Sequence, residues 1–210
     1  MLRRVTVVFF CAICAIGWGG CSRPTPTNAE KEQFVTAAEE NDIGLAERLV
    51  RRLSNRELID QKDDMNSTVL HQAAYAGSVD VAKLLVSRGA DIEAKNTLGW
   101  TPLIEAVNRS NLPIVELLTN KGADVNVQTD DKGWTPLHFA AIWAQPEIAE
   151  LLMSKGANVN ARTKKSVERQ APGDSYAGTP FPAGITPLTV ADMAGRSDMA
   201  ELLRKHGGTE

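Results

Sequence analysis

Two histidines and several acidic pairs are the residues whose chemistry has to be considered first. His71 and His138 lie 67 residues apart, and neither has a cysteine or a second histidine at the short spacing of a metal site. The chain contains no G-x-S-x-G, H-E-x-x-H or Walker string. Asp63-Asp64 and Asp130-Asp131 fall where turns are expected, which favours solvated turn residues. We therefore expect no enzymatic activity, metal, cofactor or small-molecule substrate.

Cysteine chemistry is confined to the N-terminus. All three cysteines lie within the first 21 residues. Residues 5–18 are uncharged, follow two arginines and are shorter than the ~20 residues of a membrane-spanning helix, so we predict a signal peptide over residues 1–20. An exported chain that keeps only Cys21 has no internal disulfide and is left with one odd thiol.

The residues at this junction suggest what happens to that thiol. Gly19-Gly20-Cys21 resembles the lipobox of bacterial lipoproteins, although Trp18 stands where that family usually has Leu. The resemblance implies that Cys21 is acylated and anchors the protein to a membrane of the bacterial cell envelope, on the periplasmic side or at the cell surface. An ordinary cleaved signal and an uncleaved anchor are the alternatives. Residues 21–29 are rich in Pro and Thr and are typical of a tether.

The rest of the chain is periodic. A Thr that opens a T-x-L string recurs at spacings of 33, 34 and 51 residues, at Thr68, Thr101, Thr135 and Thr186. A Gly that ends an apolar run repeats the same spacings, at Gly89, Gly122, Gly156 and Gly207. Because the Thr series and the Gly series recur at the same spacings, the chain is a tandem array of repeats. The longer last spacing indicates an insertion of about 17 residues between the last two units. An earlier, degenerate unit begins near Phe34.

Each unit encodes two helices and an extended arm. Thr can cap the first helix, and Pro102, Pro136 and Pro187 suit its first position, where no backbone donor is needed. The second helix has apolar residues at helical spacing and stops at a Gly suited to a left-handed cap. A short apolar-polar alternation then leads to the next unit.

These strings, T-P-L-H-x-A and G-A-D-V-N, resemble the ankyrin repeat family. The resemblance implies an all-α solenoid of stacked helix-turn-helix units with short β-hairpin-like arms, in which His71 and His138 are structural. Ser110 and Ala144 replace the usual inter-helix Gly and Pro146 falls at the start of a second helix, so we expect local irregularity there. The predicted division is a degenerate N-terminal capping repeat at 30–64, repeats at 65–96, 97–130 and 131–163, an inserted loop at 164–184 and a C-terminal capping repeat at 185–210.

The resemblance also implies a concave binding face, built from the arm tips, the slot between Gly and Thr, and the residues after the paired alanines. The residues predicted to contact a partner are Tyr75, Leu98, Trp100, Asn108, Arg109, Trp134, Ile142 and Trp143. Aromatic and Arg side chains often dominate protein-binding sites. The alternative is that each Trp packs on its own arm and braces the neighbouring repeat.

Charge narrows the class of partner. The chain has 23 basic and 26 acidic residues, and removal of residues 1–20 would leave 21 basic residues. An acidic surface without a basic stripe argues against nucleic acid. The sequence thus predicts a membrane-tethered adaptor that binds another protein. An immunity-type or accessory inhibitor of an exported enzyme is the alternative, and a cell-envelope spacer is a third hypothesis. The insertion is a possible second contact.

Overall fold

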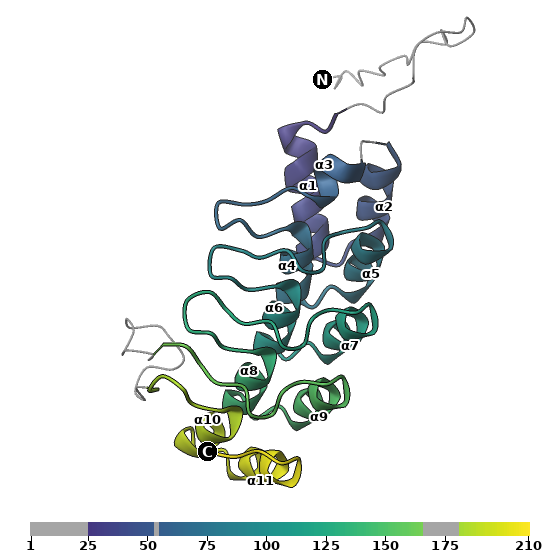
Figure 1. Cartoon of the computed structure of the whole chain (residues 1–210). Coiled ribbons are helices and arrows are strands. Elements are labelled where there is room, and N and C mark those ends of the chain that lie inside the picture. The colour runs from purple at the N-terminus through teal and green to yellow at the C-terminus, as the bar shows by residue number, and fades with distance from the viewer. Residues whose placement is uncertain (1–24, 53–54, 166–180) are drawn as a thin grey trace, which may run out of the picture.

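The computed structural model describes residues 25–52, 55–165 and 181–210. Within these ranges the chain forms helices and turns without a β-strand, and an isolated antiparallel bridge joins Lys62 to Thr68. Figure 1 shows two columns of helices, with extended arms projecting from the side of the inner column. The predicted all-α solenoid is confirmed.

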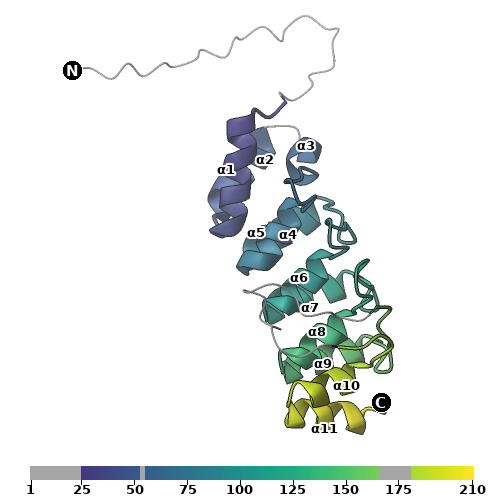
Figure 2. The same cartoon turned by 90° about the vertical axis from the view of Figure 1, so that its left-hand side faces the viewer.

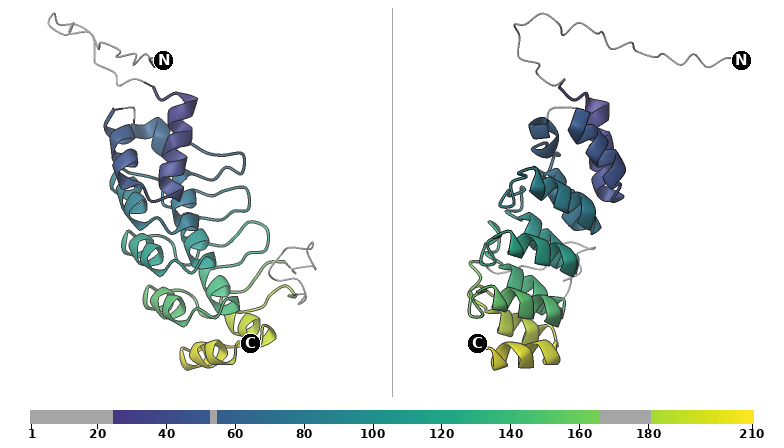
Figure 3. Two further views of the ribbon diagram at one scale, coloured as in Figure 1. Left: turned by 180° about the vertical axis from the view of Figure 1, so that it is seen from behind. Right: turned by 90° about the vertical axis from the view of Figure 1, so that its right-hand side faces the viewer.

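The inner column contains α1 (Asn28–Glu39), α4 (Val69–Ala76), α6 (Pro102–Asn108), α8 (Pro136–Ile142) and α10 (Pro187–Met193). The outer column contains α2 (Ile43–Arg52), α5 (Val79–Ser87), α7 (Leu112–Asn120), α9 (Pro146–Ser154) and α11 (Ser197–Lys205). A short additional helix, α3 (Asn55–Ile59), follows α2 at the N-terminal end. The helix pairs stack in chain order, as Figure 2 and the two views of Figure 3 show. Among the described residues, no helix is both long and apolar enough to cross a membrane.

The inner helices begin where the Thr-Pro pattern predicts. The Thr101 side chain accepts a hydrogen bond from the Ile104 backbone N–H, and Pro102 stands at the first helical position. Proline is tolerated there because a first-turn N–H has no partner within the helix. Thr186 and Pro187 start α10 in the same way.

The arms stack closely, which explains the Gly that precedes each recurring Trp. Gly99 and Gly133 have φ angles of 73° and 70°, in the left-handed region that favours glycine. A Cβ atom on Gly99 would lie 2.4 Å from the backbone N of Asp130 in the next arm, and one on Gly133 would lie 2.7 Å from Lys164. Any other residue would force neighbouring arms apart.

The core is narrow and continuous along the stack. Small residues such as Ala73, Ala74, Ala140 and Ala141 are fully buried, which lets the inner helices approach one another. Larger apolar side chains fill the space between the two columns, including Leu70, Leu85, Leu103, Leu118, Leu137 and Leu152. Each repeat therefore buries its apolar surface against its neighbours, as expected of a solenoid.

The turns between paired helices keep the same backbone despite their irregular sequence. Gly77 and Gly195 have positive φ angles, and Ser110 and Ala144 occupy equivalent turns with φ angles of 59° and 51°. Pro146 lies at the start of α9, where it removes no helical hydrogen bond. The expected irregularity is thus confined to strain at Ser110 and Ala144.

Candidate protein-binding surface

The histidines hold the arms to the inner helices. The Nδ1 atom of His71 accepts a hydrogen bond from the Thr68 backbone N–H at 3.1 Å, so Nε2 carries the proton and donates to the carbonyl of Trp100 at 3.0 Å. His138 makes the equivalent contacts two repeats later, with its Nε2 3.2 Å from the carbonyl of Ile185. Burial lowers both pKa values, that of His138 to about 4. Neutral, enclosed rings joined to backbone groups have a structural role.

The candidate metal ligands and the cysteines were checked against the described ranges. Residues 25–52, 55–165 and 181–210 contain no group of three or more His, Cys, Asp or Glu side chains that could hold a metal ion. Cys11 and Cys14, which form a C-x-x-C string, and the predicted lipidation site Cys21 lie outside the described residues.

The predicted partner residues lie at two kinds of position. Tyr75, Asn108 and Ile142 are in the last turns of three successive inner helices, with Arg109 and Trp143 at the C-caps that follow. The others belong to the arms, and they are Leu98, Trp100 and Trp134. The first group thus forms a row across α4, α6 and α8, which pack against one another.

Contacts between neighbouring side chains hold the residues of this row in position. The guanidinium carbon of Arg109 lies 3.7 Å from the centroid of the Tyr75 ring, and Tyr75 is 52% exposed. One repeat further, the indole Nε1 of Trp143 donates a hydrogen bond to the Asn108 Oδ1 at 3.0 Å. We call Tyr75, Asn108, Arg109 and Trp143 the aromatic row. Its side chains reach solvent and are already held by neighbours, which lowers the entropy lost on binding.

Two predicted contact residues are buried, and their assignment to the exposed face is corrected. Trp134 is 4% exposed and Ile142 is 6% exposed. The Trp134 ring packs edge-on against Phe139 at 5.3 Å and against Phe181 at 5.7 Å, and it lies 5.9 Å from His138. For Trp134 the bracing alternative therefore describes the structure.

Trp100 is partly buried, between the buried Trp134 and the exposed Tyr75. Its ring meets Phe139 edge-on at 5.1 Å, so it packs toward the next repeat, yet part of it remains exposed. Leu98, two residues earlier in the same arm, is 41% exposed. These two residues can contact a partner, although part of the Trp100 surface is used within the fold.

The family follows from comparison with known proteins. The sequence matches the family model described as ankyrin repeats (3 copies) over residues 26–96 and 89–163. The chain belongs to the ankyrin repeat family. No curated protein matches the sequence.

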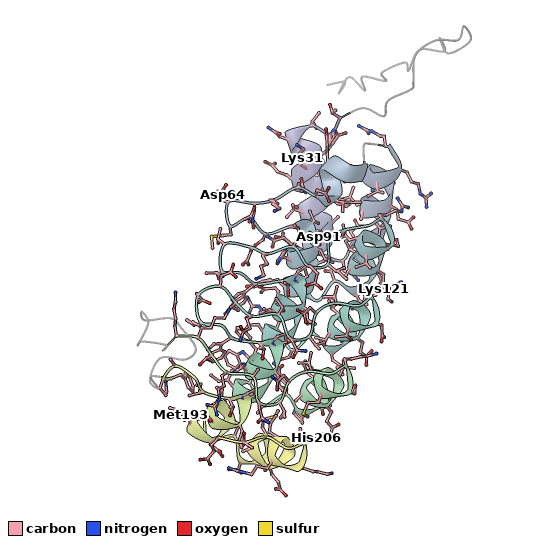
Figure 4. All side chains as sticks on the ribbon, viewed as in Figure 1. Lys31, Asp64, Asp91, Lys121, Met193 and His206 are labelled. Atoms are coloured by element: carbon pink, nitrogen blue, oxygen red, sulfur yellow. The ribbon has the colours of Figure 1, made fainter. Side chains whose placement is uncertain are left out.

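The sequence-based mapping of the concave face missed one exposed side chain, Met193 on α10, which is 37% exposed. Met65 on the first arm, which the repeat register places on that face, is 50% exposed. Figure 4 labels Met193 and Asp64, the neighbour of Met65, toward opposite ends of the arm side of the stack. Met193 lies seven residues after Thr186, as Tyr75 lies seven after Thr68, so the repeat register could have found it.

A groove of about 990 Å³ lies at the N-terminal end of the ankyrin stack, between α1, α3 and the first arm. We call it the N-terminal groove. Its charged lining consists of five carboxylates and two lysines, namely Glu32, Glu57, Asp60, Asp63, Asp64, Lys31 and Lys62. This charge pattern attracts cations more than anions.

Proposed function

We propose that this ankyrin-repeat protein is exported, anchored to a bacterial membrane through Cys21, and captures another protein on the concave side formed by its inner helices and arms. Ankyrin repeats generally mediate protein–protein interaction, and this chain belongs to that family. The N-terminal sequence pattern supports export and anchoring.

One observation carries the binding proposal. Arg109 stacks on the exposed ring of Tyr75, while Asn108 holds the indole of Trp143 in the neighbouring repeat. Tyr, Trp and Arg are enriched among residues that contribute most to protein-binding energy, and preorganised side chains lose less freedom on association. The buried Trp134 and Ile142 contribute to this surface only by supporting it.

Cross-linking in intact cells tests the proposal. A photo-reactive amino acid in place of Tyr75 should form a covalent adduct with one protein, because position 75 lies on the proposed binding face. The matched control carries the same amino acid in place of Glu116, an exposed residue of the outer helix α7. Adduct formation at 75 and not at 116 supports the proposal. Equal labelling at both positions, or none at 75, overturns it.

Substitutions in the aromatic row separate binding from folding. Arg109→Ala and Trp143→Ala should each weaken capture by about 2 kcal/mol, as expected of central contact residues. The measurement is the yield of adduct at a temperature where circular dichroism shows that each variant is fully folded. Normal yield from both folded variants would place the binding site elsewhere.

A further inference from the structure

Glu105 on α6 is a buried carboxylate without an obvious structural role. It is 9% exposed, and no other Asp, Glu, Lys or Arg side chain whose burial the structure describes is as enclosed. No hydrogen bond or ion pair joins its carboxylate to another described residue. The remaining 9% of its surface is in contact with solvent.

The neighbouring cation does not neutralise Glu105. Arg109 lies one helical turn further along α6, but its guanidinium is placed over the Tyr75 ring, 3.7 Å from the centroid, and forms no ion pair with the carboxylate. On the adjacent inner helices the equivalent positions are the uncharged Gln72 and Phe139. Among the described residues Arg109 is the charged group that acts on Glu105, and desolvation outweighs it, raising the pKa of Glu105 to about 7.

The repeat register connects Glu105 to the N-terminal groove. Gln72 lines the groove and lies four residues after Thr68, and Glu105 lies four residues after Thr101 on the next inner helix. The two helices pack against each other. Glu105 therefore occupies on α6 the repeat position that the groove-lining Gln72 occupies on α4.

Three carboxylates of the groove make no ion pair with a described residue, and these are Glu32, Glu57 and Asp64. Asp63 has a local role instead, because its carboxylate accepts hydrogen bonds from the backbone of its own arm and from Gln72. Exposed carboxylates that form no ion pair, in a groove with more carboxylates than lysines, complement a basic segment.

We infer that the bound partner presents a basic segment whose Lys or Arg side chain pairs with Glu105, while further basic residues lie in the N-terminal groove. This inference rests on the proposed function and specifies the chemistry of the partner. A buried carboxylate without a partner is unfavourable, and a cation that hydrogen-bonds to it removes that penalty. A neutral or acidic segment leaves the penalty in place, so Glu105 confers selectivity.

A pair of synthetic peptides tests this chemistry without the natural partner. The probes are 12-residue peptides of alternating Lys and Gly or alternating Glu and Gly, titrated by fluorescence anisotropy into the full-length chain in detergent. At pH 8 the Lys peptide should bind and the Glu peptide should not. Glu105→Gln should weaken Lys-peptide binding at least tenfold. The matched control Glu116→Gln, which removes the same charge from the outer helix α7, should bind as the wild type does.

Acid titration provides a second, independent readout. Lowering the pH from 8 to 6 should weaken Lys-peptide binding to the wild type several-fold, because Glu105 takes up a proton near pH 7. Binding to Glu105→Gln should change much less. The pKa of Glu105, followed by NMR, should fall when the peptide is added. Lys-peptide affinity within twofold of wild type for Glu105→Gln, or an unchanged pKa, overturns the inference.

The experiments distinguish failure of the proposed protein capture from failure of the basic-segment inference. An adduct from position 75 combined with no preference for the Lys peptide would overturn the basic-segment inference and leave protein capture standing. Glu105-dependent binding of the Lys peptide without any cross-linked protein would support the cation site and overturn capture.

Discussion

The ring of Phe181 meets the ring of Trp134 edge-on, with centroids 5.7 Å apart. Phe181 is 2% exposed and Trp134 is 4% exposed, so both belong to the core. This contact corrects two sequence-based expectations at once. Residue 181 lies within the segment 164–184 that was predicted to be an inserted loop, and Trp134 was expected to face a partner.

Trp134 and Trp143 should respond differently to truncation. Trp134→Ala should lower the free energy of unfolding by about 3–5 kcal/mol, since it removes a buried ring that packs on three others. Trp143→Ala should cost about 1–2 kcal/mol, because the side chain is half-buried and loses one hydrogen bond to Asn108. Urea denaturation measures both. Equal losses would show that the two indoles have the same role.

Residues 166–180 of the insertion should be removable, whereas Phe181 should not. Replacing residues 166–180 with a short Gly-Ser turn should change the free energy of unfolding by about 1 kcal/mol or less, because loop length has a weak effect on closure entropy. Phe181→Ala should cost about 3–5 kcal/mol. A large loss from the loop replacement alone, with Phe181 retained, would mean that residues 166–180 also pack on the fold.

Two buried titratable groups should act on stability in opposite directions. Burial lowers the pKa of His138 to about 4 from 6.5. Unfolded chains take up this proton below about pH 6.5, so His138 makes the free energy of unfolding fall as the pH drops from 6.5 to 4. Burial raises the pKa of Glu105 to about 7 from 4.5. Glu105 therefore makes the free energy of unfolding fall as the pH rises from 4.5 to 7. Each effect is worth up to about 3 kcal/mol.

Single variants should reveal these opposed effects. Glu105→Gln should raise the free energy of unfolding at pH 8 and change it little at pH 4, where the wild-type carboxyl is protonated in the fold and mostly protonated in the unfolded chain. Urea denaturation at pH 4, 6 and 8 checks this, with Glu116→Gln as the control of unchanged pH dependence. A gain of the same size at all three pH values would disprove the assignment.

Relief of strain should stabilise one turn and not its equivalent. Ala144 has a φ angle of 51°, so Ala144→Gly should raise the free energy of unfolding by about 0.5–1 kcal/mol. Ser110→Gly should gain less or lose stability, because Ser110 Oγ accepts a hydrogen bond from Gln145 Nε2 at 2.7 Å. Thermal melts rank the two variants, and the reverse order would contradict the strain argument.

The lipid anchor has its own test. Cys21→Ser should move the protein from a detergent-requiring fraction to a soluble exported fraction, or leave an unprocessed precursor, because acylation needs the thiol. Cell fractionation with intact-mass measurement decides the matter. Wild-type protein that is soluble and carries no lipid mass would reject the anchor.

Repetition determined most of this fold from the sequence alone. Helix starts at Thr101 and Thr186 depend on local capping by Thr and on Pro at the first position, and the 33-residue period fixes which units stack. Such signals lie within a few residues of one another, so a single sequence is enough to interpret them. The aromatic row followed from the same register, and Cys21 stays a prediction because it lies outside the described residues.

Only the tertiary structure decided which side chains face solvent. Trp100 and Trp134 have identical neighbours in G-W-T-P-L, yet Trp100 is partly exposed and Trp134 is buried. The difference arises because Phe181, 47 residues further along the chain, covers Trp134 after the insertion returns to the stack. Glu105 shows the same limit, since its burial is set by packing between helices. Exposure depends on neighbours distant in sequence, and local periodicity carries no information about them.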